Sequence, residues 1–301
     1  MKQIDIFYYC YNQEEYVIRA LNSISLQNYD GTINLYISDD GSKDNSLDLI
    51  RKWIQKHESL LENFNIKLIR GAESLNKGQS ATLLEGLYTG KSNFLCILEG
   101  DDYWISNDHI ASLERILEKF DFAPAAFSSW ISMNSLNQIV ESRIRRPGTT
   151  TEEFLSMESL AERNPPGTLS AMIIRREALN EIKNKLEAHQ NVADYVINLY
   201  LSAQGPIYWS ENISLNYFAA ENSIWRSLDS KKRLEIQIQQ LRTVAHTLEG
   251  DFGQFLDHVA RRLTPINVSF KLIWALFHPI KAVIILKNRL WVRILKRLGR
   301  N

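Results

Sequence analysis

The chain has 301 residues, of which 45% are hydrophobic and 23% are charged, with 35 basic and 35 acidic side chains. This composition excludes a disordered chain, a collagen-like repeat and a disulfide-stabilised miniprotein. The length suits one large domain or two modest ones. The two cysteines, Cys10 and Cys96, lie inside apolar runs, and Met1 and Lys2 lead straight into a strand pattern. We therefore expect reduced core thiols and a cytosolic chain without a secretory signal.

Strand-like and helical segments alternate over the first hundred residues. β-branched and aromatic runs predict strands, and apolar residues spaced by three or four predict helices. This alternation predicts an α/β fold in which helices cover both faces of a mainly parallel sheet. The predicted strands are 4–9, 33–37, 66–69 and 94–98. Three helices are predicted between them: one that follows Asn12, one with a buried stripe of Leu47, Ile50 and Ile54, and one over 79–88.

The alternation becomes looser after Trp104. The next segments are a helix over 108–120, a strand over 125–130, a basic loop with Arg143, Arg145 and Arg146, a strand over 168–174 and a helix that begins near Asp194. From Asp229 the apolar spacing is helical until Gly250, which is expected to end it.

Three polar clusters directly follow predicted strands. They span 9–12, 39–42 and 99–104. In open α/β sheets, ligands bind beyond the carboxyl ends of the strands, so these clusters are expected to form one site.

The pair Asp101 and Asp102 is the strongest single motif. Two adjacent carboxylates repel each other unless a cation or ligand hydroxyls satisfy them, and hard oxygen ligands suit Mg²⁺ or Mn²⁺. The alternative is a solvated turn that caps a helix. Likewise, the turn at Asn76, Lys77 and Gly78 offers a cation and bare backbone to a phosphate, but alone it is an ordinary turn.

Other chemistries find less support. The six histidines lack metal-ligand spacing, and the chain has neither a P-loop nor a glycine-rich dinucleotide motif. Kinase and dehydrogenase functions are therefore disfavoured. Asp194 precedes an apolar helical stretch, where an acidic residue can be catalytic or can simply favour the helix N-terminus.

Together these motifs resemble those of the family 2 glycosyltransferases, which have the GT-A fold. The clear resemblance covers residues 1–105, and a looser one reaches about Trp225. It implies inverting transfer of a sugar from a nucleotide donor, assisted by Mn²⁺ or Mg²⁺. The matching segments are Tyr11-Asn12, Ser38-Asp39-Asp40-Gly41-Ser42, Asn76-Lys77-Gly78 and Glu99-Gly100-Asp101-Asp102-Tyr103-Trp104.

The resemblance also implies residue roles. The donor base would be held by the backbone of Tyr9 and by Asp40, and the ribose or sugar by Asp101. Asp102 would be the metal ligand and Asp194 the catalytic base. Residues 166–168 would line the acceptor side. For the matching segment Asn76, Lys77 and Gly78, the turn chemistry described above suggests the donor phosphates as ligand.

One stretch departs from the family pattern. Bacterial relatives often carry Tyr-Arg-x-His before a Trp, with the His near the diphosphate and metal. Here Phe218 and Ala220 stand at the apparent Arg and His positions. Glu221 or Asn222 is a substitute oxygen ligand, or else the metal depends on Asp102, diphosphate and water. Weak metal dependence or lost activity is the expected consequence to test.

Charge is distributed unevenly along the chain. All acidic residues lie at or before Asp257, which leaves a net charge of −10 on the first 257 residues and +10 on the rest. After 266, aromatic and aliphatic residues alternate with basic ones, as in helices that lie on anionic membranes. The alternatives are a helical cap packed on the catalytic domain and a nucleic-acid-binding tail, which the high aliphatic content disfavours.

The sequence thus predicts a GT-A catalytic domain over 1–228 and a helical extension with a basic amphipathic tail over 229–301. Residues 1–105 form the nucleotide-sugar half and 106–228 the acceptor half. The expected protein lies on the inner face of the cell membrane and transfers sugar, from UDP by default, to a surface glycan or lipid-linked glycan. The alternatives are a nucleotide-sugar-binding protein without catalysis and a nucleotidyltransferase of related fold.

Overall fold

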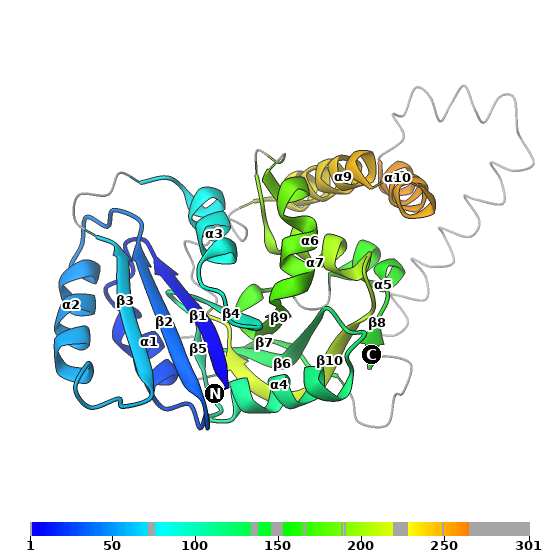
Figure 1. Cartoon of the computed structure of the whole chain (residues 1–301). Helices are drawn as coiled ribbons and strands as arrows, with labels where there is room; N and C mark the ends of the chain where they lie inside the picture. Colours follow the sequence, from blue (N-terminus) through cyan, green and yellow to red (C-terminus); the bar gives the residue numbers. More distant parts are fainter. Residues whose placement is uncertain are drawn as a thin grey trace, which may run out of the picture.

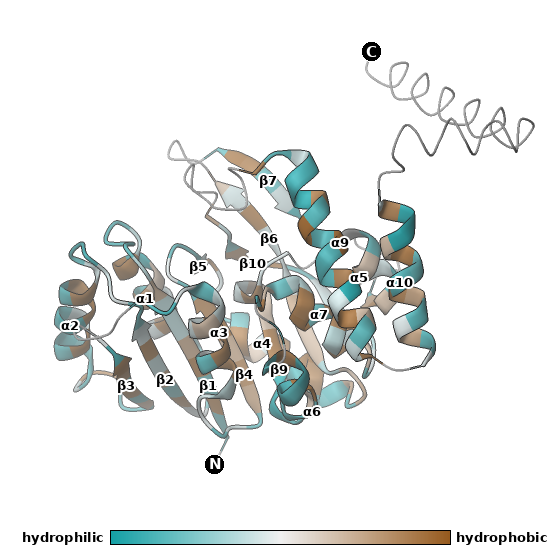
Figure 2. Ribbon diagram, turned by 90° about the horizontal axis from the view of Figure 1, so that it is seen from above, coloured by the Kyte–Doolittle hydropathy of each residue, from teal (hydrophilic) through white to brown (hydrophobic). Residues whose placement is uncertain are grey.

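The computed structural model describes residues 2–71, 76–133, 138–145, 153–164, 167–187, 189, 191–218, 228–248 and 250–264. The predicted basic tail, Ala220, Glu221 and Asn222 lie outside these ranges. The chain forms a central sheet flanked by helices (Figure 1), which confirms the predicted α/β, GT-A-like class. In Figure 2 the strands at the middle of the sheet are mostly apolar, whereas α6 carries a polar outer surface.

The first half of the sheet is parallel, in the strand order β3-β2-β1-β4. β1 is buried from Ile4 to Cys10, as its mostly apolar sequence predicts; the one charged residue in this run, Asp5, is buried as well. All four predicted strands and the connecting helices are confirmed. They are β1 (Gln3–Cys10), α1 (Val17–Ser25), β2 (Thr32–Asp39), α2 (Ser46–His57), β3 (Phe64–Arg70), α3 (Gln79–Tyr88) and β4 (Phe94–Glu99).

The second half of the sheet is mixed. β9 (Met172–Arg175) lies antiparallel between β4 and β6 (Ala125–Met133), and β10 (Ile207–Asn216) runs parallel to β6. The sheet therefore continues without a break from one half of the chain to the other. Three short strands complete it: β5 (Tyr103–Trp104) and β8 (Phe154–Leu155) pair with β10, and β7 (Ile139–Arg143) pairs with β6.

Helices of the second half pack on the sheet and on one another. α4 (His109–Lys119) contacts β6. α7 (Asp194–Ser202) contacts both α5 (Met157–Arg163) and α6 (Arg176–Glu187). α7 also contacts α9 (Ser230–Thr247), which lies against α10 (Asp251–Leu263), as Figure 1 shows. No helix in the described ranges is both long and apolar enough to cross a bilayer.

Polar residues and glycine mark some helix ends, as the residue types favour, but Asn12 does not. Asp229 accepts a 2.8 Å hydrogen bond from the N–H of Lys232, and Gly250, at φ 78°, separates α9 from α10. Asn12 does not cap α1, which begins five residues later. Instead Asn12 adopts φ 51°, and its Oδ1 accepts from the N–H of Lys43, so it fastens the loop after β2.

Candidate active site

The register of the parallel strands brings the polar clusters to one edge of the sheet. Cys10 lies opposite Asp39 at the ends of β1 and β2, and Tyr9 lies opposite Glu99 at the ends of β1 and β4. The predicted convergence of the strand ends is therefore confirmed.

Glu99, Asp101 and Asp102 form an acidic cluster directly after β4. One carboxylate oxygen from each can be chosen so that all three lie within 4.8 Å of one another. Gly100 allows this tight turn, because a Cβ there would lie 2.5 Å from the Cβ of Cys10. The N–H of Asp102 donates to the carbonyl of Glu99 at 3.0 Å, which closes the turn.

The electrostatics of the acidic cluster favour a bound cation. Burial raises the pKa of Asp102 well above its usual value, and the charges of Asp101 and Glu99 add to the effect. Burial and the Asp101 charge raise the pKa of Glu99 to about 8. Oδ1 of Asp102 accepts from the N–H of Phe218, but Oδ2 is buried and lacks a hydrogen-bond partner among the described residues. Three hard oxygen ligands with an unsatisfied buried oxygen fit Mn²⁺ or Mg²⁺.

Tyr9 joins the cluster through its side chain. Its phenol donates a 3.0 Å hydrogen bond to Oε1 of Glu99, and burial raises the phenol pKa well above its usual value. The side chain of Gln79, the first residue of α3, lies close enough to the phenol to oppose this rise in its pKa. Tyr9 therefore links the acidic cluster to the start of α3.

Asp40 and the 76–78 turn lie together at the ends of β2 and β3. Oδ1 of Asp40 accepts from Nη1 of Arg70 at 2.9 Å and from the N–H of Lys77 at 3.0 Å, and Oδ2 accepts from the N–H of Gly78 at 3.0 Å. The carboxylate therefore fixes the turn. Gly78 adopts φ 83°, a backbone conformation that favours glycine. A Cβ added there would meet nothing within 4 Å, so glycine is favoured by this conformation and not by lack of space. Asn76 precedes this pair in the same turn.

Asp194 is the first residue of α7, and its carboxylate lies near the acidic cluster. Burial raises the pKa of Asp194, whereas the N–H of Tyr195 and the amide of Asn164 lower it. Nδ2 of Asn164 donates to Oδ2 of Asp194 at 3.3 Å. The charge of Asp194 contributes to the raised pKa of Glu99, so the two carboxylates share one electrostatic environment.

Tyr217 lies close enough to all four carboxylates to interact with each of them electrostatically. Burial raises its phenol pKa, and Asp102, Glu99, Asp101 and Asp194 each add to the shift. Its ring packs on Trp130 with the centroids 5.1 Å apart. The sequence contained Tyr217 in the divergent stretch but gave it no role, because its position follows from β10, a strand that the apolar pattern did not predict.

Ser170 forms hydrogen bonds at both ends of the segment that carries the acidic cluster. Its Oγ accepts from the N–H of Glu99 at 3.1 Å, and its carbonyl accepts from the indole N–H of Trp104 at 2.8 Å. Thr168, in the segment expected on the acceptor side, accepts from the N–H of Ser170 at 3.1 Å. Pro166 lies outside the described residues.

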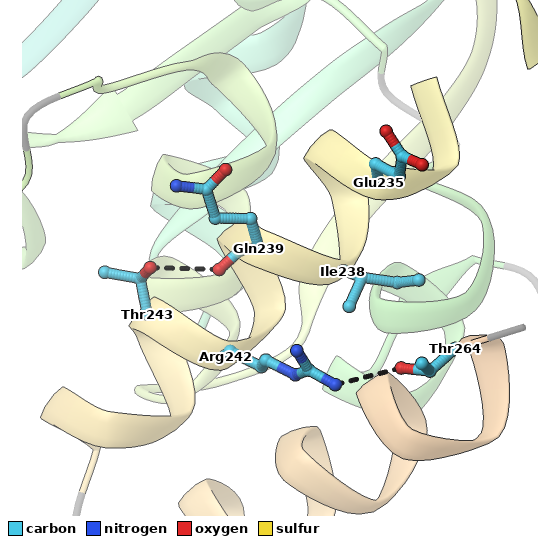
Figure 3. A pocket seen from close by; sticks show the side chains of 6 residues that line it. All are labelled: Glu235, Ile238, Gln239, Arg242, Thr243 and Thr264. Atoms are coloured by element: carbon cyan, nitrogen blue, oxygen red, sulfur yellow. Dashed lines mark hydrogen bonds between the residues drawn. The ribbon is translucent and has the colours of Figure 1, made fainter. Parts of the chain in front are cut away.

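A separate hollow of about 380 Å³ lies on the helical extension (Figure 3). It is lined by α9 residues and by Thr264, which accepts a 3.0 Å hydrogen bond from Arg242. Its other lining residues, which include Ile238 and Gln239, offer no group of carboxylates. The acidic cluster, not this hollow, therefore has the chemistry of a candidate active site.

Comparison with known proteins identifies the family. The sequence profile of glycosyl transferase family 2 matches residues 5–183, more than half of the chain. The chain belongs to this family. Rv1520 of Mycobacterium tuberculosis is 23% identical over 226 residues, which span 74% of this chain and 60% of that protein.

Solved structures agree with this assignment at the level of fold. TarS 1–349 of S. aureus, in complex with UDP-GlcNAc, superposes with a TM-score of 0.61 at 15% identity, covering 87% of this chain and 71% of TarS 1–349. The mannosyltransferase PcManGT of Pyrobaculum calidifontis, in complex with GDP-Man and Mn²⁺, gives 0.53 at 13% identity, covering 97% of this chain and 80% of that one. The GT-A fold predicted for this glycosyltransferase family member is confirmed.

Proposed function

We propose that the protein is an inverting glycosyltransferase that uses a nucleotide-sugar donor and a divalent cation. The observation that carries the proposal is the convergence of Glu99, Asp101 and Asp102 with Asp194 around Tyr217. A cation site and a separate carboxylate in the same electrostatic environment would provide the two groups that inverting transfer needs.

The donor would occupy the edge of the sheet between β1, β2 and β4. Asp102, with Asp101 and Glu99, would hold Mn²⁺ or Mg²⁺, which neutralises charge on the departing diphosphate. Tyr9 and Asp40 would contact the nucleotide base of the donor, and Asp101 its ribose or sugar. The turn of Asn76, Lys77 and Gly78 would lie near the donor phosphates. UDP is the default nucleotide, although TarS binds UDP-GlcNAc and PcManGT binds GDP-Man.

Asp194 is the proposed general base. The acceptor hydroxyl transfers its proton to the carboxylate while the hydroxyl oxygen forms a bond to the anomeric carbon. The bond from that carbon to the diphosphate breaks, and its electron pair leaves with the diphosphate. Burial raises the pKa of Asp194 toward the range in which a carboxylate accepts protons effectively.

The acceptor is proposed to be a surface glycan or a lipid-linked glycan at the inner face of the cell membrane. Support comes from the sequence after 266, which has eight basic residues, no acidic ones and many aliphatic side chains. The proposed partners are therefore the donor, the acceptor and an anionic membrane surface, without nucleic acid.

A donor panel tests the proposal. The full chain is incubated with UDP-glucose, UDP-galactose, UDP-GlcNAc or GDP-mannose, each with Mn²⁺, with Mg²⁺ or with EDTA, and the free nucleoside diphosphate is measured. A glycosyltransferase should hydrolyse one donor slowly without an acceptor, and only with the cation. Binding of a donor without turnover would favour the non-catalytic alternative. Formation of a nucleotide-sugar from a nucleoside triphosphate and a sugar phosphate would favour a nucleotidyltransferase.

A further inference from the structure

The amide of Asn164 lies between the carboxylate of Asp194 and the amide of Asn198. Nδ2 of Asn164 donates to Oδ2 of Asp194 at 3.3 Å, and Oδ1 of Asn164 accepts from Nδ2 of Asn198 at 3.0 Å. Asp194 and Asn198 are four residues apart on α7, so they share one face of that helix. Both therefore meet Asn164, which directly follows α5.

The backbone at Asn164 suits this residue type. Its φ of 40° and ψ of 62° place it in the left-handed region, where it ends α5. Asparagine adopts this conformation more readily than most other residues with a side chain. The position therefore combines a helix end with an amide directed at α7.

Asn198 determines which end of the Asn164 amide faces Asp194. Asn198 is completely buried, and its Oδ1 has no partner among the described residues, so its hydrogen bond to Asn164 offsets part of the cost of burial. Because Oδ1 of Asn164 receives that hydrogen bond, its NH₂ group points to the carboxylate. A donor in this position stabilises the ionised form of Asp194.

We propose that Asn198 and Asn164 form a relay of two amides that positions Asp194 and keeps it ionised to accept the proton of the acceptor hydroxyl. This inference rests on the proposed function of Asp194 as the base. Both asparagines are positioning residues, since they act through Asp194 and not on the substrate.

Direct titration of Asp194 tests the relay without any substrate. The full chain is labelled with ¹³C at the aspartate carboxyl carbons, and the Asp194 signal is identified by its loss in Asp194→Asn. Asn164→Gly removes the amide but tolerates the left-handed backbone. We expect the proton affinity of Asp194 to rise by about tenfold in Asn164→Gly, because a hydrogen bond to the charged form is lost. An unchanged titration would overturn the relay.

Two further variants test whether the orientation of the Asn164 amide, and not a general loss of folding, changes the titration of Asp194. Asn164→Asp keeps the acceptor for Asn198 but places a like charge beside Asp194, so it should also raise the proton affinity. Asn198→Leu should raise it less, because Asn164 keeps its donor but loses its fixed orientation. The control is Asn63→Ala, whose amide donates to the carbonyls of Tyr29 and Gly31 and should leave Asp194 unchanged.

Donor hydrolysis then distinguishes this inference from the proposed function. With the donor selected from the panel and Mn²⁺, Asn164→Gly should lower kcat, leave the donor KM unchanged and move the acidic limb of the pH profile to higher pH. If the titration of Asp194 shifts but the parent chain turns over no donor, the relay stands and the proposed function fails. If the parent is active and Asn164→Gly matches it in kcat and pH profile, the relay is wrong.

Discussion

The N–H of Phe218 donates a 2.8 Å hydrogen bond to Oδ1 of Asp102, a residue 116 positions earlier in the chain. The ring of Phe218 packs on Tyr16 at 4.6 Å, and the guanidinium of Arg19 lies 5.3 Å from the same ring. The chain after β10 thus holds one oxygen of Asp102 in place and leaves the other for a ligand.

Asp102→Asn should abolish the effect of Mn²⁺ on nucleotide binding. The amide keeps the shape of the side chain and can still accept from Phe218, but it lacks the charge that attracts a cation. Calorimetry of UDP or GDP binding, with and without Mn²⁺, measures the loss. Asp108→Asn is the control, because that carboxylate instead bonds the amide of Asn28. Equal Mn²⁺ dependence in Asp102→Asn and the parent would contradict the assignment.

The metal-free protein should lose stability as the pH rises. The folded-state pKa of Glu99 is about 8 against an ordinary value of 4.5, so folding favours its protonated form. The resulting stabilisation is complete below the unfolded pKa and is lost as pH rises from about 4.5 to about 8. Urea unfolding in EDTA across this range measures it, and Mn²⁺ should restore stability at the upper end. A stability that rises steadily with pH would contradict the raised pKa.

Asp194→Asn should reduce turnover but not donor binding. The amide keeps the size of the carboxylate and cannot take the acceptor proton, so the rate should fall by about 100-fold or more. Donor affinity, measured by calorimetry, should stay close to that of the parent. A near-normal transfer rate would mean that Asp194 only favours the start of α7, and Glu221 would become the next candidate base.

Arg70→Met should destabilise the fold markedly. The Arg70 and Asp40 side chains are 7% and 4% exposed, and their atoms lie 2.9 Å apart. Removing one partner of a buried pair costs about 3–5 kcal/mol, since the other charge stays buried. Urea unfolding measures this cost. Arg51→Met removes an exposed pair with Asp48 and should cost less than about 1 kcal/mol; similar losses in both variants would refute the difference.

Deletion of 267–301 should release the protein from anionic vesicles while nucleotide binding is retained. Each basic residue near such a surface contributes about 1 kcal/mol, so vesicle binding of the full chain should also weaken with salt. Sedimentation with phosphatidylserine vesicles measures both effects. Equal sedimentation of the two proteins would exclude the membrane role, and a truncated protein that unfolds would favour a packed helical cap.

Local patterns predicted well where the ends of the first parallel strands would meet. The strand ends that carry Tyr9, Asp39 and Glu99 follow from apolar runs that stop at polar residues. The parallel register of the strands then places these ends side by side. The role of Asp40 at the nucleotide base stays a prediction. In the structure, the two oxygens of Asp40 bind Arg70 and the turn at 77–78. These contacts depend on where β3 ends, which no local pattern specifies.

The arrangement after residue 105 was less predictable because its contacts join distant segments. β10 has a mixed polar sequence with exposed residues at 211–213, so the pattern gave no strand there and no position for Tyr217. Asn164 stands directly before two prolines, and nothing in the local sequence gives it a role in the site. Its bond to Asp194 spans 30 residues and depends on how α5 packs on α7, which sequence spacing does not reveal.

The position of β9 limits where the chain can be cut into fragments or joined to a relative in a chimera. Residues 172–175 hydrogen-bond to β4 on one side and β6 on the other, and Arg176, directly after β9, forms a 2.7 Å ion pair with the buried Asp5 of β1. A fragment that ends at residue 105 would expose the edge of β4 and leave Asp5 without its cation, so it is expected to aggregate. Residues 1–105 and the chain that follows them are therefore not expected to be exchangeable between relatives by a single crossover near residue 105. A functional chimera must carry β9 and Arg176 together with the strands that they hold.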